Sequence, residues 1–257
     1  MNINKIPSPS GLMPSSSHHL IPKIIHYCWF GPKQYSRTVR KCIATWHKHL
    51  SDYEFRLWNE ETCAAYAVSN GLPNPMEHPF VKGAYAAKKY AFVADYVRFW
   101  ALYHCGGIYL DTDMYVVKNF DNLLDATFFT AWEIPNESHD SKDERFVSCG
   151  VIGACAFEIC AQNILDKYDT LVFDDSQLDK FIVPRIITPI VLQHPAATIY
   201  PYDYFYAFPF AKRMEKNFMK YKSNNSYALH LWDISWYPWY KKAIRQLVIE
   251  LKKIRHA

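Results

Sequence analysis

Two carboxylates separated by a single residue, Asp111 and Asp113, follow the short apolar run 108–110. On an extended segment, side chains two positions apart leave the same face, so these acids would lie side by side. Like charges repel at that distance unless a cation lies between them, and carboxylate oxygens suit Mg²⁺ or Mn²⁺. Ligands of α/β sheets also bind where strands end. The pair therefore predicts a divalent-metal site that holds a diphosphate, although a D-x-D sequence alone also occurs in ordinary loops.

A second pair of charges, Asp95 and Arg98, interrupts the apolar helical run that precedes this strand. The two residues are three positions apart and share one helix face. Because burying an unpaired charge is costly, the pair has two interpretations. It is either a structural ion pair, or Arg98 binds phosphate through its planar guanidinium while Asp95 accepts hydrogen bonds from ligand hydroxyls. The turn Gly106-Gly107 would bring the helix and the strand end to one pocket.

Strand-like and helix-like segments alternate along the chain, which predicts an α/β fold. Strands are expected over 23–29, 53–58, 108–110, 114–117, 127–132 and 147–154, and helices over 37–50, from Asn59 onward, around Asp95 and Arg98, and over 157–168. This order is typical of a mostly parallel sheet flanked by helices. Beyond Asp174, prolines break the apolar stretches into short pieces such as 186–192 and 198–200. We expect a single domain, since no internal repeat or linker is evident.

The two ends of the chain differ in composition from this domain. Residues 1–20 are rich in Ser and Pro and are expected to form a disordered tail, with the folded domain over 21–235. Residues 236–257 place apolar side chains at helical spacing among Lys and Arg, which predicts a basic amphipathic helix. This helix either packs against the domain or, through 241–257, contacts an anionic membrane surface.

Composition argues against several classes of protein. The net charge of +4 is too small to indicate a nucleic-acid-binding protein. The seven cysteines are odd in number and lack C-x-x-C spacing, which argues against zinc ribbons and a disulfide framework. Neither a signal peptide nor an apolar run long enough to span a bilayer is found, so we expect a cytoplasmic protein, with peripheral contact to the inner face of the membrane as an alternative.

The combination of these motifs resembles a known family. Asp95, Arg98, Gly106-Gly107, Tyr109 and the acidic pair, together with the opening IPKIIHYCWFG, closely resemble the family-32 DXD-type sugar transferases. These include bacterial capsular polysaccharide and lipopolysaccharide glycosyltransferases, the yeast initiating α-1,6-mannosyltransferase and the glucosylating clostridial toxins. The resemblance implies a GT-A fold and retaining transfer of a hexose or N-acetylhexosamine, dependent on Mn²⁺ or Mg²⁺. The donor would be a nucleotide sugar, with a UDP-sugar favoured, and the acceptor a glycan or lipid-linked glycan in surface polysaccharide synthesis.

The resemblance also implies roles for individual residues. Asp111 and Asp113 would bind metal and diphosphate, Asp95 and Arg98 the donor sugar and phosphates, and Tyr109 and Trp29 the nucleotide, with Trp29 stacking on the base. Near the C-terminus, His230 would be a further metal ligand, while Ser235 and Trp236 would contact the β-phosphate. From the residues alone, a single histidine after the apolar segment 227–229 is also compatible with an ordinary core position.

Other interpretations stay open from the sequence. A metal-dependent phosphatase of the haloacid-dehalogenase type also places D-x-D after an apolar strand, but near the start of its domain. A non-catalytic nucleotide-sugar-binding module is the second alternative, and it would be expected to lose one carboxylate. No catalytic nucleophile is assigned. Glu133 and Asp140 lie in the region that could face the acceptor, but we expect them to be ordinary surface residues. A dinucleotide-dependent dehydrogenase is disfavoured, since no G-x-G-x-x-G follows the first strand.

Overall fold

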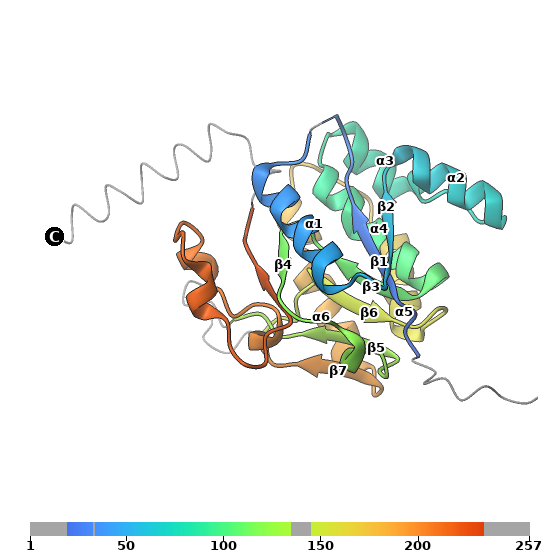
Figure 1. Cartoon of the computed structure of the whole chain (residues 1–257). Helices are drawn as coiled ribbons and strands as arrows, with labels where there is room; N and C mark the ends of the chain where they lie inside the picture. Colours follow the sequence, from blue (N-terminus) through green and yellow to red (C-terminus); the bar gives the residue numbers. More distant parts are fainter. Residues whose placement is uncertain (1–19, 33, 135–144, 234–257) are drawn as a thin grey trace, which may run out of the picture.

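The computed structural model describes residues 20–32, 34–134 and 145–233. Its centre is a six-stranded sheet in the order β2-β1-β3-β6-β5-β7 (Figure 1). The strands are β1 (Ile24–Cys28), β2 (Glu54–Trp58), β3 (Gly107–Leu110), β5 (Phe128–Ala131), β6 (Val151–Ala154) and β7 (Ala197–Tyr200). Three neighbouring pairs are parallel, and the two pairs that include β6 are antiparallel. The predicted α/β fold with a mostly parallel sheet is confirmed.

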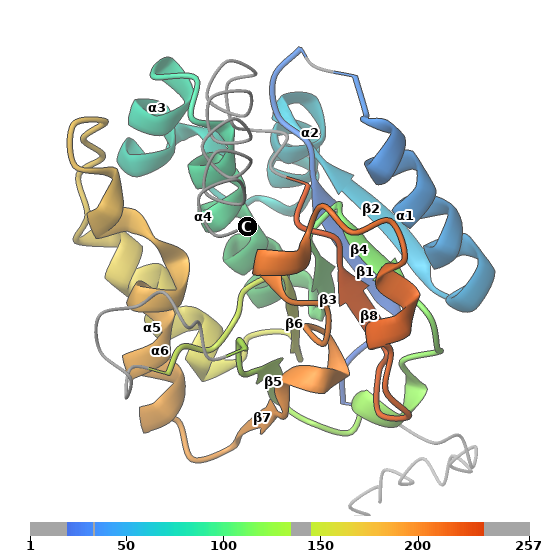
Figure 2. The same ribbon diagram turned by 90° about the vertical axis from the view of Figure 1, so that its left-hand side faces the viewer.

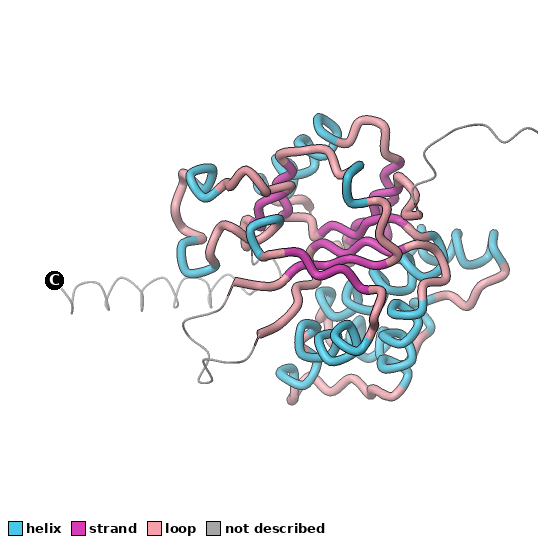
Figure 3. Tube along the Cα trace, turned by 90° about the horizontal axis from the view of Figure 1, so that it is seen from below, coloured by secondary structure: helices cyan, strands magenta, loops and turns pink. Residues whose placement is uncertain are grey.

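Within the described part of the chain, six helices flank this sheet, with most of them on one side (Figure 3). They are α1 (Arg37–His49), α2 (Glu60–Asn70), α3 (Pro79–Ala86), α4 (Tyr90–Cys105), α5 (Ile159–Asp169) and α6 (Val183–Gln193). The predicted helices over 37–50 and from Asn59 onward are found as α1 and α2. Ser36 and Asn59 cap them, since each side chain accepts a hydrogen bond from the backbone N–H of the third residue that follows it. No helix among the described residues is both long and apolar enough to cross a membrane.

A second, two-stranded sheet lies beside α1. It pairs β4 (Met114–Val116) with β8 (Ala228–His230) in antiparallel register. Short 3-10 turns connect the remaining segments: η1 (Pro75–Glu77), η2 (Asp121–Leu123), η3 (Leu178–Phe181), η4 (Tyr202–Tyr204), η5 (Phe210–Lys212) and η6 (Phe218–Tyr221). Figure 2 shows the small sheet between α1 and the C-terminal part of the described chain.

The apolar core consists of two clusters, and the side chains of β3 point alternately into one and the other. Ile108 and Leu110 pack in a cluster with Trp46 of α1 and the residues of the small sheet. Tyr109 points to the other face, into a cluster shared with α2 to α6. Since successive strand residues point to opposite faces, Asp111 follows Tyr109 to the face of the second cluster, where the Tyr109 hydroxyl lies 3.1 Å from its carboxylate.

Two sequence expectations differ from the structure. The strand expected over 147–154 begins only at Val151, because residues 148–150 bend and present their carbonyls to neighbouring groups. The apolar stretch 186–192, which was expected to be a short piece bounded by prolines, is part of the helix α6. Pro184 lies in the first turn of that helix, where no intrahelical N–H bond is lost, and the interior Pro189 is tolerated with its chain neighbours still helical.

Candidate active site

The acidic pair lies directly after β3, but the segment that carries it is not extended as predicted. The backbone N–H of Asp111 donates to the carbonyl of Gly150 at 2.8 Å, and the N–H of Met114 donates to the carbonyl of Asp111 at 3.0 Å. These bonds close a turn over 111–114, so the carboxylates are brought together by a turn rather than by strand alternation.

Three side chains form a set that can hold a divalent metal ion. Asp111, Asp113 and His230 each offer a ligand atom, and these atoms all lie within 4.8 Å of one another. His230 comes from β8, where it pairs with Met114 in the register of the small sheet. Its Nε2 is 3.0 Å from Oδ1 of Asp113, and its buried Nδ1 has no hydrogen-bond partner among the described residues. Two carboxylates and an imidazole suit Mn²⁺ or Mg²⁺, so the predicted ligand set fits the metal.

The two acids change the titration of the imidazole. Burial lowers the pKa of His230, but the charges of Asp113 and Asp111 and the hydrogen bond to Asp113 outweigh it, so the pKa lies above its usual value. A negative environment that stabilises an imidazolium also attracts a metal cation. The same electrostatics therefore favour cation binding at this position.

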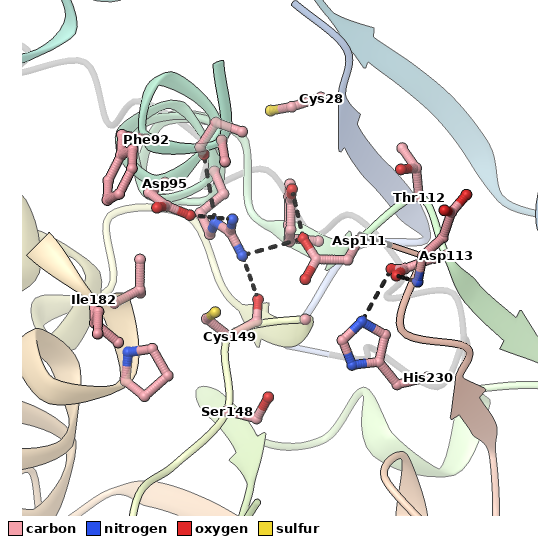
Figure 4. A pocket seen from close by; sticks show the side chains of 18 of the residues that line it. Cys28, Phe92, Asp95, Asp111, Thr112, Asp113, Ser148, Cys149, Ile182 and His230 are labelled. Atoms are coloured by element: carbon pink, nitrogen blue, oxygen red, sulfur yellow. Dashed lines mark hydrogen bonds and ion pairs between the residues drawn. The ribbon is translucent and has the colours of Figure 1, made fainter. Parts of the chain in front are cut away.

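The pair on α4 lies next to this cluster. Arg98 Nη2 is 2.5 Å from Oδ1 of Asp95, and Arg98 Nη1 is 3.3 Å from Oδ1 of Asp111. The guanidinium also donates to the carbonyl of Cys149 at 2.7 Å and lies 4.5 Å from the centre of the Tyr109 ring. Asp95 and Arg98 thus form a buried ion pair, and Arg98 also links α4 to the acidic turn. In Figure 4, dashed lines join the labelled Asp95 and Asp111 through this guanidinium.

Burial dominates the electrostatics of this pair. It raises the pKa of Asp95 to about 7, although Arg98 opposes the shift, because the charged carboxylate loses its hydration. Arg98 stays charged in the same environment, since the nearby Tyr109 and Asp111 hold its pKa well above the usual value despite the opposing effect of burial. The guanidinium is therefore a fixed positive charge beside the metal ligands.

These residues line one pocket of about 450 Å³. Trp29 and Tyr109 also line it, as predicted, and Tyr109 donates a hydrogen bond to Asp111 at 3.1 Å. The ring of Trp29 packs edge-on against Tyr35, with centroids 4.8 Å apart. In Figure 4, Asp95, Asp111, Asp113 and His230 lie around the same space. Ser235, Trp236, Asp140 and the predicted helix over 236–257 lie outside the described residues, as does nearly all of the tail over 1–20.

The structure adds a carboxylate that was expected at the surface. Glu133, just after β5, lines the pocket and bonds with Ser148. Burial raises the pKa of Glu133 to about 7, against the opposing effects of His230 and Ser148. Its expected place as an ordinary surface residue is therefore wrong. Its position after a strand of the sheet was the available signal, since ligands bind at strand ends.

The backbone of two further residues also completes the pocket. Asp233 donates its backbone N–H to Oδ2 of Asp113 at 2.7 Å, while its carboxylate accepts a hydrogen bond from Ser36 at 2.5 Å. Gly150 lies so close to the acidic turn that a Cβ there would be 2.9 Å from Oδ2 of Asp111. Neither residue carries a local sequence signal, because both act through contacts between distant segments.

Comparison with known proteins places the acidic turn within a region that matches a family of sugar transferases. Residues 36–130 match a family model described as "Glycosyltransferase sugar-binding region containing DXD motif". Inositol phosphoceramide mannosyltransferase 1 of Schizosaccharomyces pombe is 31% identical over 113 residues, which cover 42% of this chain and 33% of that protein. An uncharacterised glycosyltransferase of Acanthamoeba polyphaga mimivirus is 32% identical over 119 residues, which cover 46% of this chain and 45% of that protein. The chain thus spans less than half the length of each of these relatives.

Solved structures of similar shape are also glycosyltransferases. PaToxG glycosyltransferase has a TM-score of 0.49 at 19% identity, over 67% of this chain and 68% of that one. The galactosyltransferase LgtC has a TM-score of 0.44 at 13% identity, over 80% and 86%. Both TM-scores are below 0.5, so the family assignment depends on the sequence matches. The match over residues 36–130 confirms the resemblance to DXD-type sugar transferases that the sequence predicted.

Proposed function

We propose that this chain is a glycosyltransferase that depends on a divalent metal and moves a sugar from a nucleotide sugar to a glycan or lipid-linked glycan acceptor. The observation that carries the proposal is the meeting of two features in one pocket. Three ligand atoms, from Asp111, Asp113 and His230, lie within 4.8 Å of one another, and the buried guanidinium of Arg98 lies 3.3 Å from the first of them. A diphosphate joined to a sugar is a ligand that uses both features.

In this proposal the metal-binding residues and the arginine act on the diphosphate. Mn²⁺ or Mg²⁺, held by Asp111, Asp113 and His230, would neutralise the diphosphate as the glycosidic bond breaks. Arg98 binds the phosphates with a guanidinium that Asp95 and the Cys149 carbonyl already hold in place. Asp95 accepts hydrogen bonds from hydroxyls of the donor sugar. No side chain is assigned as a nucleophile, and retention of the anomeric configuration follows from the family resemblance.

The nucleotide lies against the wall formed by Trp29 and Tyr109 in this proposal. Both line the pocket, and an indole at its edge suits stacking on a base. Ser235 and Trp236 stay predicted contacts of the β-phosphate. The cytoplasmic location and the membrane contact through 241–257 likewise stay predictions. We favour a UDP-sugar as donor and surface polysaccharide as product. Because several relatives are named as mannosyltransferases, GDP-mannose belongs among the donors tested.

The test is a panel of donors with the whole chain. UDP-glucose, UDP-galactose, UDP-N-acetylglucosamine and GDP-mannose are incubated with Mn²⁺, and release of the nucleotide diphosphate is measured with and without EDTA. We expect one donor to be hydrolysed in a way that EDTA abolishes. Asp113→Asn should reduce the rate about 100-fold or more, since it removes a charged metal ligand. Asp166→Asn, an exposed change on α5, is the matched control and should leave the rate unchanged.

Three outcomes would contradict the proposal. If no donor binds or is hydrolysed, the chain does not use nucleotide sugars. If calorimetry shows metal-independent binding of a nucleotide sugar without turnover, the chain is a binding module. If phosphate is released from simple phosphomonoesters while donors stay intact, the acidic turn serves a phosphatase.

A further inference from the structure

The outer face of α1 is basic throughout. Its four exposed Lys and Arg side chains are Arg37, Arg40, Lys41 and Lys48, and the helix contains no acidic residue. Their spacing places them on the side opposite Val39 and Trp46, which are buried. A helix that concentrates positive charge on one exposed face attracts anions to that face.

The segment 212–222, which contains η6, is basic as well. Lys212, Lys216, Lys220 and Lys222 are exposed, while Glu215 is the one acid in the segment. Lys220 Nζ lies 2.5 Å from a Glu215 oxygen, so a single positive charge is largely compensated. The net charge of the segment therefore stays strongly positive.

The two stretches form one continuous surface, here called the basic face. Lys41 Nζ lies 4.8 Å from the centre of the Phe218 ring and 5.3 Å from that of Tyr115 in β4. Figure 1 shows α1 on one side of the small sheet and the red-orange segment around η6 on the other. Near the other end of the helix, the charge of Lys222 lowers the pKa of His49, after the larger effect of burial.

The basic face also exposes apolar side chains. Met214 is 60% exposed and Met219 is 41% exposed, and lysines precede or follow each of them within two residues. Flexible apolar side chains surrounded by lysine suit the boundary between lipid headgroups and acyl chains, where a soluble polyanion would offer them nothing. The combination favours a lipid surface over a nucleic acid or an acidic polysaccharide.

We infer that the basic face binds the anionic headgroups of a membrane. This surface adjoins the pocket, because Ser36 at the start of α1 is bonded to Asp233, and Phe210, just before the basic segment, lines the pocket. A chain bound through this face would hold the pocket opening beside the bilayer. The inference concerns described residues, is separate from the contact predicted for 241–257, and does not depend on the proposed transfer reaction.

The test is sedimentation of the whole chain with vesicles. Vesicles of phosphatidylcholine with 30% phosphatidylglycerol are compared with pure phosphatidylcholine at 50 mM and 500 mM NaCl. We expect binding to the anionic vesicles at low salt, with at least a tenfold loss at high salt. Lys48→Glu/Lys216→Glu should weaken partitioning by at least about 30-fold, since losing each basic residue near an anionic surface costs roughly fivefold and the new acids are repelled as well. Met214→Ser should weaken it about fivefold at either salt concentration.

The matched control is Lys167→Glu/Arg185→Glu, which makes the same change of charge at exposed positions on α5 and α6. This variant should sediment like the unmodified chain, and circular dichroism should show that both double variants are folded. Equal losses in the two double variants would overturn the inference, because net charge would then explain binding. A lack of binding to anionic vesicles would also overturn the inference. So would binding to heparin or DNA that Lys48→Glu/Lys216→Glu weakens, if the chain does not bind the vesicles.

Discussion

The buried pair on α4 gives the sharpest prediction for stability. Arg98 and Asp95 keep only 5% and 11% of their side chains exposed, and Arg98 also faces Asp111. Arg98→Met keeps the length of the side chain but leaves the carboxylate of Asp95 without its partner. Removing one member of a buried ion pair costs about 3 to 5 kcal/mol. For a chain of this size, that lowers the melting temperature by about 6 to 20 °C.

Urea denaturation and calorimetry measure this loss, and an exposed pair is the control. Arg56 bonds with Glu54 at 2.5 Å, with 28% and 55% of the two side chains exposed. Arg56→Met should therefore cost about 1 kcal/mol or less. The double variant Asp95→Asn/Arg98→Met should recover at least about 1.5 kcal/mol relative to Arg98→Met, because the unpaired charge is gone. Equal costs for Arg98→Met and Arg56→Met would refute the electrostatic account of this site.

Three further predictions test other parts of the structure. Burial lowers the pKa of His26 to about 4. As the pH falls below 6.5, this histidine therefore becomes protonated in the unfolded chain but stays neutral in the folded chain. Stability should then fall as the pH decreases from 6.5 to 4, by about 3 kcal/mol in total, and urea titrations of His26→Gln should lack this part of the slope. Gly150→Ala places a methyl group against the Asp111 carboxylate and should weaken Mn²⁺ binding at least about tenfold in calorimetry; an unchanged affinity would exclude Asp111 as a ligand. Trp29→Ala should weaken UDP binding by about 1 to 3 kcal/mol, while Trp132→Ala, the control, should change it by less than a tenth of that.

Sequence patterns predicted the part of the site that one continuous stretch supplies. The charges of Asp95 and Arg98 stand out within an apolar helix, and the acidic pair follows its strand after the turn at Gly106. Each of these signals is local, since helical periodicity and short apolar runs depend on neighbours in the chain. The sequence predicted that the helix and the strand end face one pocket, but it did not predict the 3.3 Å contact between Arg98 and Asp111 that joins them.

The parts that the sequence did not predict depend on contacts between distant segments. Glu133 differs from an ordinary surface glutamate because it lines the pocket, where it bonds with Ser148 and lies near enough to His230 for that charge to affect its pKa. No sequence pattern predicts the bend over 148–150. There the carbonyl of Cys149 accepts a hydrogen bond from Arg98, and the carbonyl of Gly150 accepts one from the backbone of Asp111. Helix α6 was not predicted because its prolines indicate helix ends. Pro184, however, lies in the first turn, where a proline removes no backbone hydrogen bond of the helix.

The register of the small sheet decides whether the metal ligands meet at all. His230 lies opposite Met114, one residue from Asp113, and its neighbours Ala228 and Leu229 are buried. A slip of one residue in this pairing would turn His230 away and present Leu229 instead, because side chains alternate between faces. The backbone bond from Asp233 to Asp113 holds the same strand from its other end. The proposed third ligand of the acidic turn thus comes from a residue more than a hundred positions away, and the short pairing of β4 with β8 brings together the three side chains that could hold a cation.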